Sequence, residues 1–400
     1  MKLINTAIGI VTAKIARRPF YVRFHITHRC NYRCRMCSFH HLGDHSTELS
    51  GPQVRVVAQR LAELGARHVV ITGGEPFVRP DLPEVIATFA EQSFSVRIQT
   101  NGGPQVTRPL LAACVSAGLQ DLSVSIDTLD SRLQDGICGS RGVVQNALRT
   151  LQLATELLPG SMSLANVVAS AYNFKELPSL VSYFTDMGVY TYITPVMISG
   201  DHDKDINEFR FRSDDNTFRL GNLNPEVRDR VMNQLIEMRR NGWGLVNSTR
   251  FLNDFHSFLL TGQCNWHCSS ETLGLEVHPD GNVSFCKEKP PSGNILDPGF
   301  IDYYRSRESH RKAALLAENC TGCFYGEYRE PYYAVNDLSV LHEWTRDWFR
   351  TFRRGLRFGK QGTRALPSVL LKADGVNDPA DNNIDPMPES PARDVLRHRD

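Results

Sequence analysis

The sequence predicts an α/β protein: a partial, TIM-like (β/α)6 barrel followed by a small cysteine-rich domain. Strand-like runs alternate with helix-period segments from about residue 20 to residue 197. The ten cysteines gather mainly in two groups instead of being spread along the chain. At 400 residues and 41% hydrophobic composition, the chain is long enough for two domains with a substantial core. Six strand–helix units, where a full barrel has eight, predict a barrel open on one side, which would admit a bulky substrate.

Each expected strand is a short apolar or β-branched run, and a helix-period segment follows it. The expected strands are 21–27, 68–72, 95–100, 121–126, 162–169 and 189–196. The expected helices within the barrel are 50–64, 81–92, 107–117, 143–157 and 174–187. Gly118 and Gly188 follow two of these helices directly, as expected of residues that end a helix.

The flanking segments complete the predicted organisation. Residues 1–19 form a basic amphipathic helix, which either packs on the barrel, residues 20–197, or makes a peripheral membrane contact through residues 1–18. A helical bridge is expected over 198–263, with a helix over 226–240. The cysteine-rich domain spans 264–330 and contains a hairpin over 273–286. A C-terminal helix over 331–360, aromatic and basic from 338 to 354, precedes a tail over 361–400 whose composition predicts disorder.

Charge and cysteine usage exclude several classes of protein. Lys plus Arg is 45 and Asp plus Glu is 44, so no nucleic-acid partner is expected. No apolar run reaches the roughly 18 residues that a membrane span needs. Clustered thiols in a chain of this length are typical of metal sites in a reducing compartment and not of a disulfide scaffold, so a cytoplasmic location is expected.

The first cysteine group lies directly after the first strand, as Cys30-x3-Cys34-x2-Cys37. In an α/β barrel that end of a strand carries the chemistry. Three thiolates on a [4Fe–4S] cluster leave one iron open for a small molecule. The alternative is a zinc site, which needs a fourth ligand from the nearby histidines His25, His28, His40 and His41.

Gly73-Gly74-Glu75-Pro76 follows the second strand. Paired glycines let a backbone approach a ligand closely, although such a run alone is also typical of an ordinary turn. Its position one strand–helix unit after a loop with three cysteines makes the pair of motifs specific.

Together these two motifs resemble the radical S-adenosylmethionine (SAM) superfamily, and the resemblance extends over about residues 20–330. It implies a radical SAM barrel whose three cysteines hold a [4Fe–4S] cluster, with SAM bound at the open iron. Reductive cleavage of SAM would then yield a 5′-deoxyadenosyl radical that abstracts a substrate hydrogen. The SAM contacts that the resemblance implies come from the ends of strands two, three and four: Gly73, Gly74, Glu75, Pro76, Thr100, Asn101, Ser125 and Asp127.

One position departs from the family pattern. Cys138 stands where similar enzymes often have an arginine, and Arg141 follows three residues later. Arg141 is therefore the candidate for contacting the SAM carboxylate, and the alternative is that both are ordinary loop residues.

The second cysteine group reads Cys268-x17-Cys286-x33-Cys320-x2-Cys323. It resembles the shortened SPASM domain called Twitch, which implies an auxiliary [4Fe–4S] cluster that accepts an electron from the substrate radical. Zinc is the alternative here too. Cys264 stands just before the group as an alternative ligand, a hydrogen donor to a substrate radical, or a buried thiol. Cys114, on an apolar helix face, is expected in the core.

The function predicted from this resemblance is biosynthetic modification of a peptide, a sugar-like molecule or a lipid. Oxidation, epimerisation or formation of a C–C or C–X bond would be the net reaction, and a flavodoxin or ferredoxin would supply electrons. The alternative from another class is a non-catalytic zinc or Fe–S scaffold, which would cleave no SAM.

Overall fold

A single curved sheet organises the molecule. The computed structural model describes residues 2–37, 48–198, 215–264, 268, 273–318, 320 and 322–346, and the structural statements below concern these residues. The sheet has nine strands in the order β6-β5-β4-β3-β2-β1-β7-β8-β9. Its first six strands run parallel, as predicted: β1 (Tyr21–His25), β2 (His68–Thr72), β3 (Ser95–Thr100), β4 (Leu119–Ser125), β5 (Leu164–Ala169) and β6 (Tyr190–Pro195).

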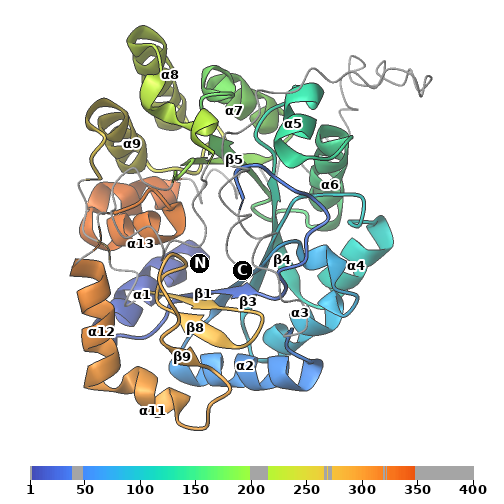
Figure 1. Cartoon of the computed structure of the whole chain (residues 1–400), viewed down its shortest axis with the longest axis vertical. Coiled ribbons are helices and arrows are strands. Elements are labelled where there is room, and N and C mark those ends of the chain that lie inside the picture. Colours follow the sequence, from blue (N-terminus) through green and yellow to red (C-terminus); the bar gives the residue numbers. More distant parts are fainter. Residues whose placement is uncertain are drawn as a thin grey trace, which may run out of the picture.

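Helices cover the outer side of the six parallel strands, as Figure 1 shows. They are α2 (Gly51–Leu64), α3 (Leu82–Glu91), α4 (Arg108–Ser116), α5 (Ser131–Cys138), α6 (Val143–Leu157) and α7 (Leu177–Asp186), with single turns η3 (Pro76–Val78) and η4 (Phe174–Glu176). Phe24, Ile71 and Ile98 point outward from the sheet into this layer and are fully buried. Side chains alternate along a strand, so Tyr21, Arg23 and His25 face the lumen instead.

The cysteine-rich region continues the same sheet. Its hairpin consists of β7 (Gly274–Val277) and β8 (Asn282–Ser284), and β9 (Gly293–Asn294) follows. β7 pairs in parallel with β1, in the register that places Glu276 beside Arg23. The hairpin is predicted from the sequence, and the φ of 83° at Gly281 in its turn is one that favours glycine. The parallel pairing of β7 with β1 is not predicted, because local pattern carries no information about partners far along the chain.

The helix that follows the last cysteines, α13 (Gly326–Asn336), contacts both β6 and β7. A Cβ added at Gly326 would overlap the Tyr192 hydroxyl on β6, while Tyr328 on the same helix donates a hydrogen bond to Glu276 on β7 at 2.8 Å. A C-terminal helix is expected from residue 331, and in the structure α13 begins at Gly326.

The remaining helices lie in the bridge and after β9. In the bridge, α8 (Pro225–Arg240) and α9 (Thr249–Thr261) follow the turns η6 (Asn216–Phe218) and η7 (Leu220–Asn222), and α11 (Phe300–Arg305) and α12 (Arg307–Glu318) follow β9. A further helix begins at Leu338 and is described as far as residue 346. The rest of the predicted C-terminal helix, the tail 361–400 and His40 and His41 lie outside the described residues.

The N-terminal helix α1 (Lys2–Ile15) packs on the body of the molecule. Ile10 and Ala13 are buried in a small cluster with Leu273, whereas Ile15 is 79% exposed. The packed alternative thus holds for one face of this helix, and membrane contact stays a prediction. None of the described helices combines the length and apolar character that crossing a membrane requires.

Candidate functional site

The loop carrying the first three cysteines is held against the C-terminal turn of α5. The backbone amide of Arg33 donates to the carbonyl of Cys138 at 3.0 Å, and that of Arg35 donates to Ile137 at 2.9 Å. The last carbonyls of a helix have no partner within the helix, so they are available to a docking loop. The sequence pattern does not predict α5, and one alternative for Cys138 was an ordinary loop residue; in the structure Cys138 is the last residue of this helix.

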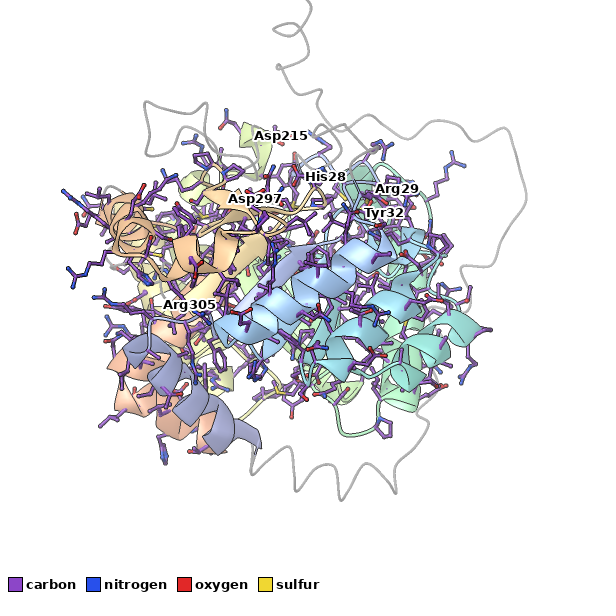
Figure 2. All side chains as sticks on the ribbon, turned by 90° about the horizontal axis from the view of Figure 1, so that it is seen from below. His28, Arg29, Tyr32, Asp215, Asp297 and Arg305 are labelled. Atoms are coloured by element: carbon purple, nitrogen blue, oxygen red, sulfur yellow. The ribbon has the colours of Figure 1, made fainter. Side chains whose placement is uncertain are left out.

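Two ion pairs hold the same loop at its ends. Arg29 pairs with Glu48 at 2.8 Å, and Arg35 pairs with Asp215 at 2.8 Å. In Figure 2, His28, Arg29, Tyr32 and Asp215 all lie in the upper part of the view, and Arg305 lies lower, on the left. The loop is therefore tied both to the segment before α2 and to the segment that leads into the bridge.

The three thiols of the loop lie within electrostatic reach of one another. Burial, with the nearby charges of Glu75 and Cys37, raises the pKa of the Cys30 thiol to about 11. A hydrogen bond with Cys138, and then burial, raise the pKa of Cys34 well above its ordinary value. Thiols that share one small region in this way fit a polynuclear cluster, in which each thiolate binds its own iron.

No three His, Cys, Asp or Glu side chains in the described ranges converge as the ligands of a single ion would. His25, one candidate fourth ligand for zinc, lies instead in the lumen, with its Nε2 2.7 Å from Glu276.

The two glycines after β2 let that strand end dock on the cysteine loop. The Gly74 amide donates to the Thr27 carbonyl at 2.8 Å, and the Glu75 amide donates to the Arg29 carbonyl at 2.8 Å. A Cβ added at Gly74 would overlap the Arg29 carbonyl oxygen, and one at Gly73 would overlap that of Thr27. The glycines are thus required by the close approach of two protein segments.

The Glu75 carboxylate ties the end of β2 to the end of β3. It accepts hydrogen bonds from the amide of Phe77 at 3.0 Å, the hydroxyl of Thr100 at 2.7 Å and the amide of Asn101 at 2.7 Å. Burial raises its pKa to about 7, although these three donors act in the opposite direction. Glu75 and Thr100 are therefore engaged within the protein, and Pro76 is buried at the start of η3.

Asn101 is the side chain that links β3 to the cysteine loop. Its Nδ2 donates to Asn31 at 2.8 Å and approaches the Cys30 sulfur at 3.7 Å. Its Oδ1 accepts from the Gly103 amide at 2.8 Å, which fixes the orientation of the amide group.

The SAM contacts predicted at and after β4 differ in whether their side chains are already hydrogen-bonded within the protein. Ser125 is half-buried on the lumen face of β4. Asp127 accepts from the Val168 amide at 2.8 Å, and burial raises its pKa to about 6. Arg141 is exposed in the turn between α5 and α6. The structure thus brings Ser125 toward the lumen and uses Asp127 to join β4 to β5.

The second group of four thiols forms another cluster of interacting groups. Burial raises the pKa of Cys286, and the neighbouring charge of Cys268 adds to the shift. The pKa of Cys323 is raised by burial and then by Cys268, Cys286 and Cys320. Two backbone amides approach sulfur atoms, Glu288 to Cys286 at 3.5 Å and Gly322 to Cys320 at 3.4 Å. Cys264, half-buried after α9, is described, but residues 265–267 beside it are not.

The lumen contains a buried charged network that the sequence pattern does not predict. Glu276 and His25 form its centre, Tyr328 donates to Glu276, and Arg23 lies 3.6 Å from the same carboxylate. Arg23 also approaches Glu327 at 3.4 Å. The alternate polar residues of β1 are the signal that could have revealed it, since a strand covered on both faces is ordinarily apolar throughout.

Residues 24–184 match the family model described as the radical SAM superfamily. Curated relatives include the GTP 3′,8-cyclase of Vibrio atlanticus, 28% identical over 192 residues, which are 47% of this chain and 57% of that protein. A probable GTP 3′,8-cyclase of Methanopyrus kandleri is 35% identical over 177 residues, 43% of this chain and 55% of that protein. The chain thus spans a little over half the length of the curated relatives it matches.

Solved structures match over more of the chain. Streptococcus suis SuiB bound to S-adenosylmethionine has a TM-score of 0.55 at 13% identity and covers 74% of this chain and 68% of its own. The protein anSMEcpe with bound AdoMet has a TM-score of 0.56 at 14% identity, and the match covers 85% of this chain and 98% of that chain. At this identity the likeness concerns the fold, and the predicted α/β partial barrel is confirmed. Residues 24–184 thus form a radical SAM domain.

Proposed function

We propose that the protein cleaves SAM reductively at Cys30, Cys34 and Cys37 and uses the resulting radical to abstract a hydrogen from a polar substrate held in the barrel lumen. The observation that carries the proposal is the docking of the Gly73–Gly74 segment on the loop that gathers the three thiols. The [4Fe–4S] cluster, when bound, supplies the electron that breaks the C–S bond of SAM.

The chain's own residues position this chemistry. Asn101 steadies the Cys30 sulfur, and the end of α5 holds the loop backbone. Since Glu75 and Asp127 are occupied by protein donors, the contacts to SAM that fit best come from the main chain of Gly73 and Gly74 and from Ser125. Arg141 would reach the SAM carboxylate only if the turn after α5 reoriented, because its side chain is exposed.

The second thiol group supports an auxiliary cluster at Cys268, Cys286, Cys320 and Cys323. Cys286 follows β8 directly, Cys268 lies before β7, and Cys320 and Cys323 lie before α13. With four protein ligands, such a cluster has no open iron and would act by electron transfer. We assign it the role of accepting the electron left on the substrate radical, which makes the net reaction a two-electron oxidation.

The lumen favours a polar substrate without a large net charge. Its strands present Gln99, Ser125 and Asn166 inward by register, a surface poorly suited to an acyl chain. Arg23 and Arg97 on the same face are already paired with carboxylates, Arg97 with Asp121 at 3.4 Å. A peptide side chain or a sugar-like molecule fits these groups better than a lipid or a nucleoside triphosphate.

The relatives' names suggest a competing substrate. The curated relatives are cyclases of GTP, whereas SuiB and anSMEcpe have been solved with peptides, the precursor SuiA and Cp18Cys. GTP is therefore the first compound to test against the polar-substrate proposal, and a flavodoxin or ferredoxin is the electron donor to supply.

Anaerobic reconstitution with iron and sulfide counting tests the cofactor assignment. We expect about eight irons per wild-type chain, as two [4Fe–4S] clusters require, and 5′-deoxyadenosine formed from SAM with a strong reductant. Cys34→Ala should abolish 5′-deoxyadenosine formation. Cys323→Ala should lose the auxiliary iron yet still cleave SAM, and Cys114→Ala, in the buried face of α4, is the matched control.

A single zinc at Cys30, Cys34 and Cys37 would contradict the proposal, as would a cluster that leaves SAM intact. GTP that stimulated 5′-deoxyadenosine formation and was itself converted would overturn the choice of substrate class while leaving SAM cleavage in place.

A further inference from the structure

A hollow with a volume of about 270 Å³ lies where α1, α2 and α11 end. Arg17 and Arg18, which follow α1, line it together with Gly65 after α2 and Arg305, the last residue of α11. Arg305 marks its position at the left of Figure 2. Arg18 and Gly65 each precede a strand by a few residues, so the hollow lies at the N-terminal edge of the sheet. The cysteine loop follows the opposite end of β1, and the hollow is therefore separate from the site described above.

The hollow carries an excess of positive charge. Among the residues that line it, the guanidinium groups of Arg17, Arg18 and Arg305 stand against a single carboxylate, that of Glu63. Glu63 and Arg305 pair at 3.5 Å with about half of each side chain exposed, and an ion pair of this kind contributes little. The side chain of Arg18 lies over Gly65, where an added Cβ would come within 2.8 Å of its Cδ. The hollow is therefore suited to an anion.

Arg17 has a backbone conformation that favours glycine. Its φ is 48°, and the amide of Arg18 donates to the carbonyl of Ala13 at 3.0 Å. This is the hydrogen bond of a helix end at which glycine usually occupies the left-handed position. An arginine is less stable there than a glycine. Its strained position indicates a use for the guanidinium group that ending the helix does not explain.

An apolar rim adjoins the hollow. Val11 and Ile15 are four residues apart and so lie on the same face of α1, where they are 39% and 79% exposed. Ile10 and Ala13 occupy the buried face of the helix. Ile15 is followed directly by Ala16, which lines the hollow. Aliphatic side chains next to basic ones are typical of helices that lie in a membrane interface.

We propose that the end of α1 binds a membrane surface that contains anionic phospholipid. Val11 and Ile15 enter the boundary between headgroups and acyl chains, and the three arginines of the hollow contact lipid phosphates. The positive charge of the hollow complements anionic headgroups, and the two aliphatic side chains gain from burial in lipid. Binding of this kind places the protein at a membrane and leaves the lumen free for a polar substrate, so it goes beyond the proposed function.

An acidic soluble protein, such as a flavodoxin that donates electrons, is the competing occupant. It would match the arginines but not the aliphatic rim. It would also dock at the edge of the sheet opposite the cysteine loop, whereas electron transfer to the first cluster requires a donor close to that loop. A membrane surface matches both the charge and the rim.

Flotation with lipid vesicles tests this binding in full-length reconstituted protein. The vesicles contain phosphatidylcholine alone or phosphatidylcholine with phosphatidylglycerol, and binding is measured over a series of salt concentrations. We expect the wild type to bind only the anionic vesicles, and to bind them less at high salt, because salt screens exposed charges.

The charge variants are Arg17→Gly, Arg305→Gln and Glu63→Gln. The two arginine variants should each weaken binding about fivefold, as expected for one basic residue near an anionic surface, and Glu63→Gln should strengthen it. In thermal melts Arg17→Gly should match the wild type, because relief of the turn offsets the greater flexibility of glycine in the unfolded chain. The matched control is Arg55→Gln, which breaks a similarly exposed pair with Glu91 at 3.5 Å and should bind like the wild type.

Ile15→Ser removes an apolar contact without changing the charge. Its weaker binding should persist at high salt, whereas the effects of the charge variants should shrink there. Equal binding of the wild type to both kinds of vesicle would overturn the inference. So would equal binding of the wild type, Arg17→Gly and Ile15→Ser to the anionic vesicles.

Two further outcomes would overturn it in favour of another occupant. If the wild type ignores vesicles but binds inorganic phosphate in calorimetry, and Arg17→Gly does not, the hollow is a site for a free anion. If the wild type ignores vesicles but binds a flavodoxin, and Arg17→Gly loses that binding, the hollow is a docking site for a protein.

Discussion

Replacing Glu276 by glutamine is expected to weaken the junction between the barrel and the cysteine-rich hairpin. Glu276 is fully buried on β7 and accepts from His25 at 2.7 Å and from Tyr328 at 2.8 Å. Burial acts to raise its pKa, but the hydrogen bond from His25 and the charge of Arg23 outweigh that effect and hold the pKa below its ordinary value. Burial lowers the pKa of His25, so a neutral imidazole donates to an ionised carboxylate.

The expected loss is about 2–4 kcal/mol, because each hydrogen bond to a charged group contributes roughly 1.5–3 kcal/mol. The oxygen of glutamine can keep the Tyr328 bond in weaker, neutral form. Its NH2 group faces the Nε2–H of His25, donor against donor, and that bond is lost unless the imidazole changes tautomer. Arg23 retains Glu327 at 3.4 Å and so keeps a carboxylate partner.

Hydrogen–deuterium exchange read by mass spectrometry measures this locally, without requiring reversible unfolding of a protein with clusters. At 1.4 kcal/mol per tenfold, amides of β1 and β7 should exchange roughly 30- to 700-fold faster in Glu276→Gln. The matched control is Glu63→Gln, whose carboxylate is 56% exposed and pairs with Arg305 at 3.5 Å. An exposed pair contributes less than about 1 kcal/mol, so exchange there should change only a few-fold.

Equal protection of β1 and β7 in Glu276→Gln and in the control would refute the reasoning. It would mean that the parallel pairing of these strands is maintained by their backbone ladder and outward-facing apolar residues, with the buried charges making no net contribution.

Three further outcomes follow from the contacts around the site. Burial raises the pKa of Glu75 to about 7, so the free energy of unfolding should be highest below pH 4.5 and should fall as the pH rises through 7, by at most about 3 kcal/mol. Glu75→Gln should lack this decline in a pH series of thermal melts. Gly74→Ala, whose Cβ would overlap a carbonyl of the cysteine loop, should lower the iron content at the first site, whereas Gly51→Ala, with open space at its Cβ, should leave it unchanged. Gly326→Ala should displace α13 from Tyr192 on β6 and speed limited proteolysis of the chain around α13, and unchanged cleavage would show that the helix can shift without cost.

Local pattern was sufficient for the six parallel strands and for the two cysteine groups. Strands β2 and β3 have the predicted ends, because apolar alternation and turn glycines are properties of neighbouring residues. The motif Cys30-x3-Cys34-x2-Cys37 likewise needs only spacing. The short helix α5 was missed because its eight residues contain a glycine and several polar side chains, and its buried face is defined by the loop that docks on it.

The order of residues along the chain is enough to predict which thiols form each group and that a glycine pair follows one strand later. The partners of the buried carboxylates depend on the fold, since Glu75, Asp127 and Glu276 each accept from a residue far along the chain or on another strand. The physical reason is that a buried charge must be matched by donors that folding brings to it, and pairings between distant strands leave no periodic trace in either strand.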